Sequence, residues 1–201
     1  MQNVFAAVGG CVLFAAGVFV GTAPQDEKKA PTAAASEQDG AMAALKPTAE
    51  HAYLAKLAGK WKAKMTMYGG PQPVTSTGVE TVRMDLGGLW QVSDFVEDKG
   101  GKFGGFAGHG LMGWDPTAKH YVGTWFDAWS YTPTNMKGTL DKTGKILTVD
   151  ATGKDPSGAA MSMQMIHTDV DDKHRTFSMR IPGADGAGGF MEVMKIEYAR
   201  E

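Results

Sequence analysis

The sequence predicts an all-β fold in which an antiparallel meander of eight to ten strands closes into a barrel. Three observations predict it. Most segments after residue 47 alternate apolar and polar side chains with a period of two, as half-buried strands do. Short turns rich in Asp, Pro and Gly separate these segments. No strand–helix–strand rhythm is present, so a parallel sheet is not expected. A long meander with one apolar face buries that face and removes its free edges by closing on itself.

The composition limits the function classes that need to be considered. The chain has 201 residues, with 22 acidic and 20 basic side chains and a net charge of −2. Nucleic-acid partners require a basic surplus, which this chain lacks, so we predict no nucleic-acid partner. The single cysteine excludes a disulfide framework, a cysteine-based zinc site and an iron–sulfur cluster.

Residues 1–23 are predicted to be an N-terminal signal or membrane anchor, because they carry no charged side chain. Twenty such residues span about 30 Å as a helix, which is roughly one hydrocarbon core. The small residues Gly21–Ala23 suit signal cleavage, whereas Pro24 disfavours it. Because short N-terminal apolar segments usually serve export, we expect the domain in the periplasm or cell envelope, either released after signal cleavage or tethered by an uncleaved anchor in the membrane. Lys28 and Lys29 argue for the opposite topology by the positive-inside rule.

Residues 24–46 are predicted to be a disordered tether. They are rich in Ala and Pro and contain no aromatic residue, so they cannot bury enough apolar surface to offset the entropy of ordering. A flexible chain of this length spans about 25 Å r.m.s.. The composition changes at Pro47, and residues 47–201 are predicted to form the β-barrel domain.

A short helix is predicted at the start of this domain and is expected to cap one end of the barrel. Thr48 is a suitable N-cap, and Gly59 a suitable terminator, for a helix that runs to Leu57. Tyr53 and Leu54 give the helix one apolar face together with Leu57.

The strands follow the helix in order, each with one alternating apolar face and a turn at its end. The apolar faces comprise Trp61, Ala63, Met65 and Met67; Val82, Met84 and Leu86; Trp90, Val92 and Val96; Phe177, Met179 and Ile181; and Met194, Ile196 and Tyr198. Turn chemistry occurs at Asp115-Pro116, Asp141–Gly144, Asp155-Pro156 and Asp185-Gly186.

The helix followed by Gly59-Lys60-Trp61 resembles the Gly-x-Trp opening of lipocalin-like (calycin) barrels. This resemblance implies that Trp61 covers the closed end of the barrel and that a basic residue near the last strand packs on it. Arg200 is the first candidate for that residue and Lys195 the second.

Longer strings of the sequence resemble the bacterial domain-of-unknown-function family 1579, over residues 47–200. They are Glu50-His51, Gly59–Trp61, Gly78–Arg83, Gly108–Pro116 and Tyr121–Asp127. Trp114 stands where the family pattern leads us to expect Tyr. The family has no established activity, so the resemblance implies a fold and no function.

A candidate pocket is predicted from pairs in which alternation places a polar side chain beside a large apolar one. Such a mixture is typical of small-molecule sites. The candidate residues are Trp90, Asp94, His109, Met112, Trp125, Asp127, Met163 and His167.

Thirteen methionines make the chain rich in a flexible apolar side chain. Methionine fills irregular cores and also lines adaptable binding surfaces, so the pattern leaves a packed barrel and a ligand cavity both open. The strand methionines are Met65, Met67, Met84, Met112, Met161, Met163, Met165, Met179 and Met194.

The five histidines have no metal-ligand spacing, and we predict no metal site and no cofactor. His109 lies between glycines and either belongs to the core or serves a pocket as an acid, a base or a haem ligand. His167 follows the methionines of its strand, where a haem-binding calycin could use it axially, but no haem motif accompanies it. The remaining histidines are predicted to be solvated: His51, His120 and His174.

Carboxylates within predicted strands need partners if they are buried. We expect Arg83 or Arg180 to pair with Glu80, Asp94 or Asp127. No Gly-x-Ser-x-Gly elbow is present, so a serine hydrolase is not expected.

Three functional hypotheses remain. The first is a non-enzymatic barrel that binds a small apolar or amphipathic ligand. The second is an isomerase- or hydrolase-type enzyme that uses Asp94, His109 and Asp127 at the barrel mouth. The third is a filled barrel that acts through its surface.

Overall fold

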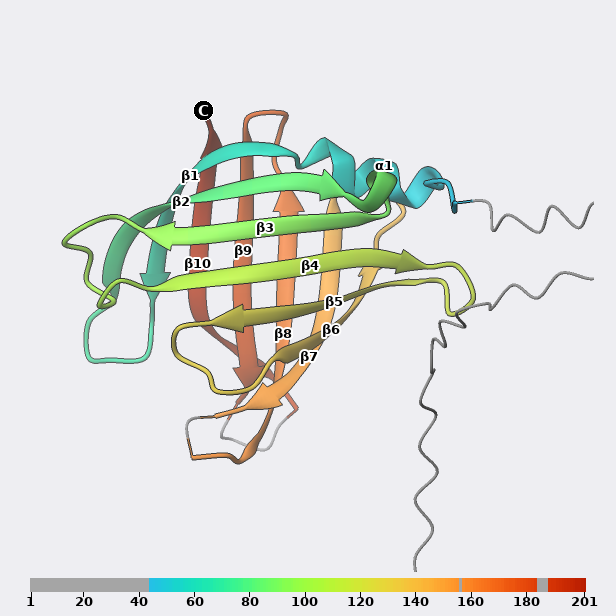
Figure 1. Cartoon of the computed structure of the whole chain (residues 1–201). Helices are drawn as coiled ribbons and strands as arrows, with labels where there is room; N and C mark the ends of the chain where they lie inside the picture. The colour runs from blue at the N-terminus through green and yellow to red at the C-terminus, as the bar shows by residue number, and fades with distance from the viewer. Residues whose placement is uncertain (1–43, 156, 184–187) are drawn as a thin grey trace, which may run out of the picture. The chain divides into compact units, whose positions relative to one another are not determined.

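The computed structural model describes residues 44–155, 157–183 and 188–201. A closed barrel of ten antiparallel strands follows one short helix (Figure 1). This confirms the predicted fold class. The predicted signal or anchor, residues 1–23, lies outside the described residues, as does the predicted tether up to residue 43. Within the described ranges, no helix combines the length and the apolar character needed to cross a membrane.

The elements follow one another without a crossover. In chain order they are α1 (Ala49–Lys56), β1 (Gly59–Met67), β2 (Val74–Asp85), the 3-10 turn η1 (Leu86–Gly88), β3 (Trp90–Glu97), β4 (Ala107–Asp115), β5 (His120–Asp127), β6 (Thr134–Leu140), β7 (Ile146–Lys154), β8 (Ala160–Asp169), β9 (His174–Pro182) and β10 (Phe190–Arg200).

Each strand pairs with its neighbour in sequence, and β1 pairs with β10 to close the barrel. The closing register places Trp61 opposite Arg200. A single register shift among these pairings lies on β10, between Glu192 and Met194. Because the meander is antiparallel, α1 and the turns before the odd-numbered strands lie at one end, which we call the closed end. The loops after the odd-numbered strands lie at the other, which we call the open end.

The predicted turn at Asp185-Gly186 lies outside the described residues. The predicted turns at Asp115 and Asp141 are stabilised by the aspartate side chains, which accept hydrogen bonds from backbone N–H groups later in the chain. Asp115 Oδ1 accepts from the N–H groups of Thr117 and Ala118, both at 2.9 Å. Asp141 Oδ1 accepts from the N–H groups of Lys145 and Ile146, both at 3.0 Å. These turns connect adjacent strands at the closed end.

Helix α1 begins at the predicted N-cap and covers the closed end of the barrel. The backbone N–H of Thr48 donates to Nδ1 of His51 at 2.9 Å. His51 is buried, so the prediction that it is solvated is wrong: its ring caps the helix instead of facing water. The Tyr121 hydroxyl donates to the Glu50 carbonyl at 3.0 Å and fastens the helix to β5.

Two arginines and one tryptophan form the closed end. The Arg200 guanidinium lies 4.2 Å from the ring centroid of Trp61, and that of Arg175 lies 4.6 Å from the same ring. The Trp61 indole N–H donates to the Leu57 carbonyl at 2.9 Å. Arg175 also forms a buried ion pair with Glu80. The expected partners of Glu80, Arg83 or Arg180, are therefore wrong for this carboxylate.

Candidate functional site

The barrel encloses a cavity of about 340 Å³. Leu54 of α1 and the C-cap residue Leu57 line its floor at the closed end, and Lys154 and Asp155 line it at the open end. A single hollow therefore runs along the barrel between the ten strands.

Methionine side chains dominate the middle of this cavity. Because inward positions alternate along each strand, one strand presents several of them in a row. Nine methionines line the hollow and form what we call the methionine belt: Met65, Met67, Met112, Met136, Met161, Met163, Met165, Met179 and Met194. Their thioether side chains are flexible and polarisable, so the wall can adapt to the shape of an apolar occupant.

Trp125 lies against the inner face of β4, where two glycines leave room for its ring. A Cβ atom on Gly108 would lie 2.2 Å from the indole, and one on Gly110 would lie 3.0 Å from it. The indole N–H donates to Asp127 Oδ2 at 2.9 Å, while Asp127 Oδ1 accepts from the backbone N–H of Trp129 at 2.9 Å. Asp127 therefore fixes both the tryptophan and the loop that follows β5.

The loop after β3 borders the open end and is held by the carboxylate of Glu97. This carboxylate accepts from the backbone N–H groups of Phe103 at 2.9 Å, Gly105 at 2.8 Å and Phe106 at 3.0 Å, and from the Ser76 hydroxyl. Burial alone would raise the pKa of Glu97, but these hydrogen bonds outweigh it and lower the pKa to about 2. The loop therefore has a fixed conformation at the mouth.

Aromatic side chains gather beside that loop. The rings of Phe106 and Trp129 lie with their centroids 4.3 Å apart, and Phe103 contacts Trp129 edge-on at 5.9 Å. Phe106 and Trp129 also line the cavity. This side of the entrance is therefore apolar, although Trp129 is 41% exposed, and Lys154 and Asp155 supply charged groups at the same end.

His167 lines the cavity near the closed end. Its ring stacks edge-on against Phe177, with the centroids 5.0 Å apart. Burial, and then the charge of Arg175, lower the pKa of His167 to about 3. The imidazole is therefore neutral at physiological pH.

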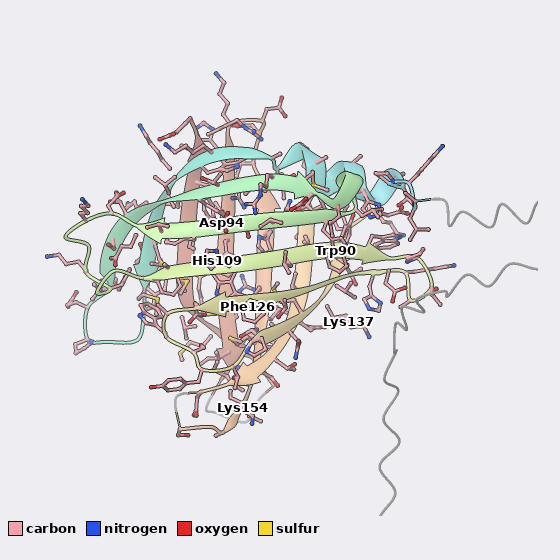
Figure 2. All side chains as sticks on the ribbon, viewed as in Figure 1. Trp90, Asp94, His109, Phe126, Lys137 and Lys154 are labelled. Atoms are coloured by element: carbon pink, nitrogen blue, oxygen red, sulfur yellow. The ribbon has the colours of Figure 1, made fainter. Side chains whose placement is uncertain are left out.

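Five of the eight predicted pocket residues line the cavity: Met112, Trp125, Asp127, Met163 and His167. The other three, Trp90, Asp94 and His109, face outward, so their predicted inward placement is wrong. Figure 2 shows Asp94 and His109 side by side on the outer face of β3 and β4. Asp94 accepts from Arg83 Nη1 at 2.5 Å and contacts His109 Nδ1 at 2.6 Å.

The physical reason lies in the register of the strands. The pairings of β3 with β4 and of β4 with β5 run without a shift. His109 and Met112 are three residues apart, so without a bulge they must lie on opposite faces. The bulge that would have brought them together is absent from these pairings.

The apolar face of β3 points away from the cavity, against expectation. Trp90 packs over Gly113 on the outer surface, where a Cβ would lie 2.9 Å from its ring. Apart from the buried Phe95, the inner face of β3 carries polar residues whose partners lie elsewhere in the chain. Gln91, for example, donates to the Leu54 carbonyl at 2.8 Å.

The hypothesis of an enzyme at the barrel mouth required Asp94, His109 and Asp127 to lie together, and the structure does not bring them together. Asp127 lies inside the barrel, whereas Asp94 and His109 lie outside, so the three side chains are not assembled into one group. In the part of the chain that the structure describes, no three His, Cys, Asp or Glu side chains gather closely enough to hold a metal ion.

Two residues that shape the cavity were missed by the sequence analysis, namely Arg175 and Glu97. A signal for Arg175 was present, because it continues the alternation of Phe177, Met179 and Ile181 toward the start of the strand. Glu97 lies two residues after the buried Phe95 and therefore on the same face of β3. Both were overlooked because charged side chains are rarely placed inside a barrel.

Comparison with known proteins supports the fold and leaves the activity open. A family model described as "Protein of unknown function (DUF1579)" matches residues 46–200. No sequence among the curated proteins matches at a significant level.

Solved structures that match this chain include the following two. One is the crystal structure of Rv2717c from M. tuberculosis, with 12% sequence identity and a TM-score of 0.56, covering 77% of this chain and 98% of that one. The other is a redesigned beta barrel, b11L5F_LGL, with 17% identity and a TM-score of 0.40, covering 74% of this chain and 95% of that one. At 12% identity, the likeness to Rv2717c supports the fold alone.

Proposed function

The chain belongs to the DUF1579 family of proteins of unknown function, and within that family we propose that this barrel is a non-enzymatic binding protein for a small, mainly apolar molecule. The family supplies no activity, so the proposal rests on the interior of the barrel.

The observation that carries the proposal is the cavity of about 340 Å³ with its methionine belt. Small-molecule sites typically occupy about 300–1,000 Å³ and combine an apolar lining with a few placed polar groups. Here the lining is mainly apolar, with thioether, aromatic and aliphatic side chains, and a few polar groups are placed among them. Such a wall suits a molecule with a long apolar portion.

The same cavity argues against a barrel that is simply filled. Protein interiors pack densely, and voids larger than a water molecule are few. Atoms that line an empty void lose dispersion contacts, which destabilises the folded state. A hollow of this size inside one small domain is better explained by an occupant than by packing.

We also propose that the domain works in the cell envelope, on the basis of the charge-free residues 1–23. These residues would act as a cleaved export signal or as an anchor in the membrane. Expression of the full chain in a bacterial host, followed by fractionation and N-terminal sequencing, tests this. A full-length protein in the cytoplasmic fraction would contradict it.

The binding proposal is tested with a neutral fluorescent probe, N-phenyl-1-naphthylamine, titrated into the full chain. We expect one probe per barrel with a blue-shifted emission. The variant Met163→Trp places a larger side chain in the cavity, whereas Ser162→Trp places the same side chain on the outer face of β8.

Met163→Trp should abolish binding while Ser162→Trp preserves it, provided that circular dichroism and thermal melting show both variants to be folded. Equal binding by the two variants would place the probe elsewhere, for example on residues 1–23. No binding to the wild-type chain would overturn the proposal.

A further inference from the structure

We infer that His167 is the polar anchor of the ligand, and that the ligand is an uncharged amphipathic molecule whose hydroxyl or carbonyl group lies at the closed end. Its apolar chain then extends along the methionine belt toward the open end. This inference rests on the proposed function of the cavity and specifies the chemical class that the cavity takes.

His167 differs from the other histidines in its hydrogen bonding. Four of the five rings have a protein partner through Nδ1: His51 with Thr48, His109 with Asp94, His120 with the Ala118 carbonyl and His174 with Asp171. Across the described ranges, neither ring nitrogen of His167 has such a partner, although the side chain lines the cavity.

The His167 ring is held in place by its neighbours on both sides. Register places it opposite Leu147 on β7 and opposite Phe177 on β9. The edge-on contact with Phe177, at 5.0 Å between centroids, fixes the plane of the imidazole. Leu147 and Phe177 offer no polar group, so the hydrogen-bonding capacity of His167 is directed to whatever fills the cavity.

His167 is half-buried and keeps accessible surface on the cavity, so a purely apolar ligand that displaced water from it would leave the imidazole without hydrogen bonds, which is unfavourable. A neutral imidazole has one N–H donor and one nitrogen acceptor. A ligand hydroxyl can use either of them, and a ligand carbonyl can use the donor. Either group would satisfy His167 without a rearrangement of the barrel.

The charges at the closed end explain why the group should be uncharged. Glu80 and Arg175 pair with each other, so neither offers a free charge to a ligand. The guanidinium of Arg175 also lies 4.0 Å from the ring centroid of Tyr198 and 4.6 Å from that of Trp61. Its Nε–H has no partner among the described residues, but that atom is buried and has no surface on the cavity.

A carboxylate at this position would find the guanidinium of Arg175 already paired with Glu80, so no unpaired cation would offset its charge. It would also lose its hydration inside an apolar barrel, which is costly for an ion. An alcohol or a carbonyl compound avoids both penalties. His167, being neutral, gives no compensating charge.

The test measures how well three eight-carbon compounds displace N-phenyl-1-naphthylamine from the full chain. They are octane, 1-octanol and octanoate, which share the chain length and differ at one end. The wild-type chain should bind 1-octanol about tenfold more tightly than octane, which corresponds to one hydrogen bond. It should bind octanoate more weakly than 1-octanol.

Two variants of His167 separate hydrogen bonding from packing. His167→Phe should weaken 1-octanol binding about tenfold and leave octane binding within about twofold. His167→Gln keeps a donor and an acceptor and should retain most of the preference for the alcohol. His174→Phe, on the exposed end of β9, is the matched control and should behave as wild type.

Each outcome decides between the two claims. If the wild-type chain binds the probe but shows no preference for 1-octanol over octane, or prefers octanoate, the inference is wrong and the binding function stands. Equal losses for all three compounds in His167→Phe would also overturn it. If neither the probe nor any of the three compounds binds, the proposed function fails and the inference fails with it.

Discussion

Arg200 stacks on the indole ring of Trp61, with its guanidinium carbon 4.2 Å from the ring centroid. The same guanidinium donates to the carbonyl of Ala58 at 2.6 Å and to that of Lys56 at 2.8 Å. One side chain from the last strand thus connects the first strand with the C-terminal end of α1. The closure of the barrel and the position of its floor depend on the same contact.

Loss of either side chain should destabilise the fold. Trp61→Ala should lower the free energy of unfolding by about 3–5 kcal/mol, because the ring is fully buried. Arg200→Ala should lower it by about 1–2 kcal/mol, through the cation–π contact and the carbonyl hydrogen bonds. Urea denaturation of the single and double variants should give a coupling energy above about 0.5 kcal/mol, whereas additivity would count against the contact.

Position 108 must be glycine to leave room for the indole ring of Trp125. Gly108→Ala should lower the free energy of unfolding by about 1–3 kcal/mol, because its Cβ would lie 2.2 Å from the indole. Gly69→Ala is the control, since no atom lies within 4 Å of its Cβ position. Denaturant melts of the two variants measure the difference. Equal stability of Gly108→Ala and wild type would mean that Trp125 does not rest on β4.

Glu97 should make the barrel sensitive to acid. Its pKa is lowered to about 2 in the folded state from a reference value of 4.5, so its contribution is complete above pH 4.5 and is lost as the pH falls toward 2. Glu97→Gln should be less stable than wild type at pH 7, and the gap should close between these two pH values. Thermal melts across that range measure it. A gap that stays constant down to pH 2 would contradict the assignment.

The outer pair of Asp94 and His109 should matter little for binding. His109→Ala removes an exposed contact, so it should change the free energy of unfolding by less than about 1 kcal/mol and leave probe affinity unchanged. Trp125→Ala removes a cavity wall and should weaken probe binding severalfold. Titration of N-phenyl-1-naphthylamine into both variants compares them directly. A larger loss of probe affinity in His109→Ala than in Trp125→Ala would contradict the outward placement of His109.

The fold was predictable because a period-two pattern needs only local information. On β1, Trp61, Ala63 and Met65 are all buried in the barrel. On β8, the alternating pattern places Met163 and His167 on the wall of the cavity. The number of strands and their antiparallel order then follow from the turns. A meander of this length has few alternatives to closure.

Which face of β3 points into the barrel was not predictable from the residues of that strand alone. Its inward face carries Gln91 and Glu97, and their partners are a helix carbonyl and three backbone N–H groups of the next loop. If those partners are not known, the alternation of β3 predicts that its polar face points to solvent. The pairing of Glu80 with Arg175 was missed for the same reason, since 95 residues separate them along the chain.

The most direct test of a ligand-binding cavity is the NMR spectrum of the full chain with methyl-labelled methionine, recorded as 1-octanol is added. We predict that the methyl signals of the methionine belt, Met163 and Met165 among them, shift and saturate together. The signal of Met191, which is 53% exposed at the start of β10, should stay in place. Belt signals that do not move at saturating 1-octanol would contradict the central claim.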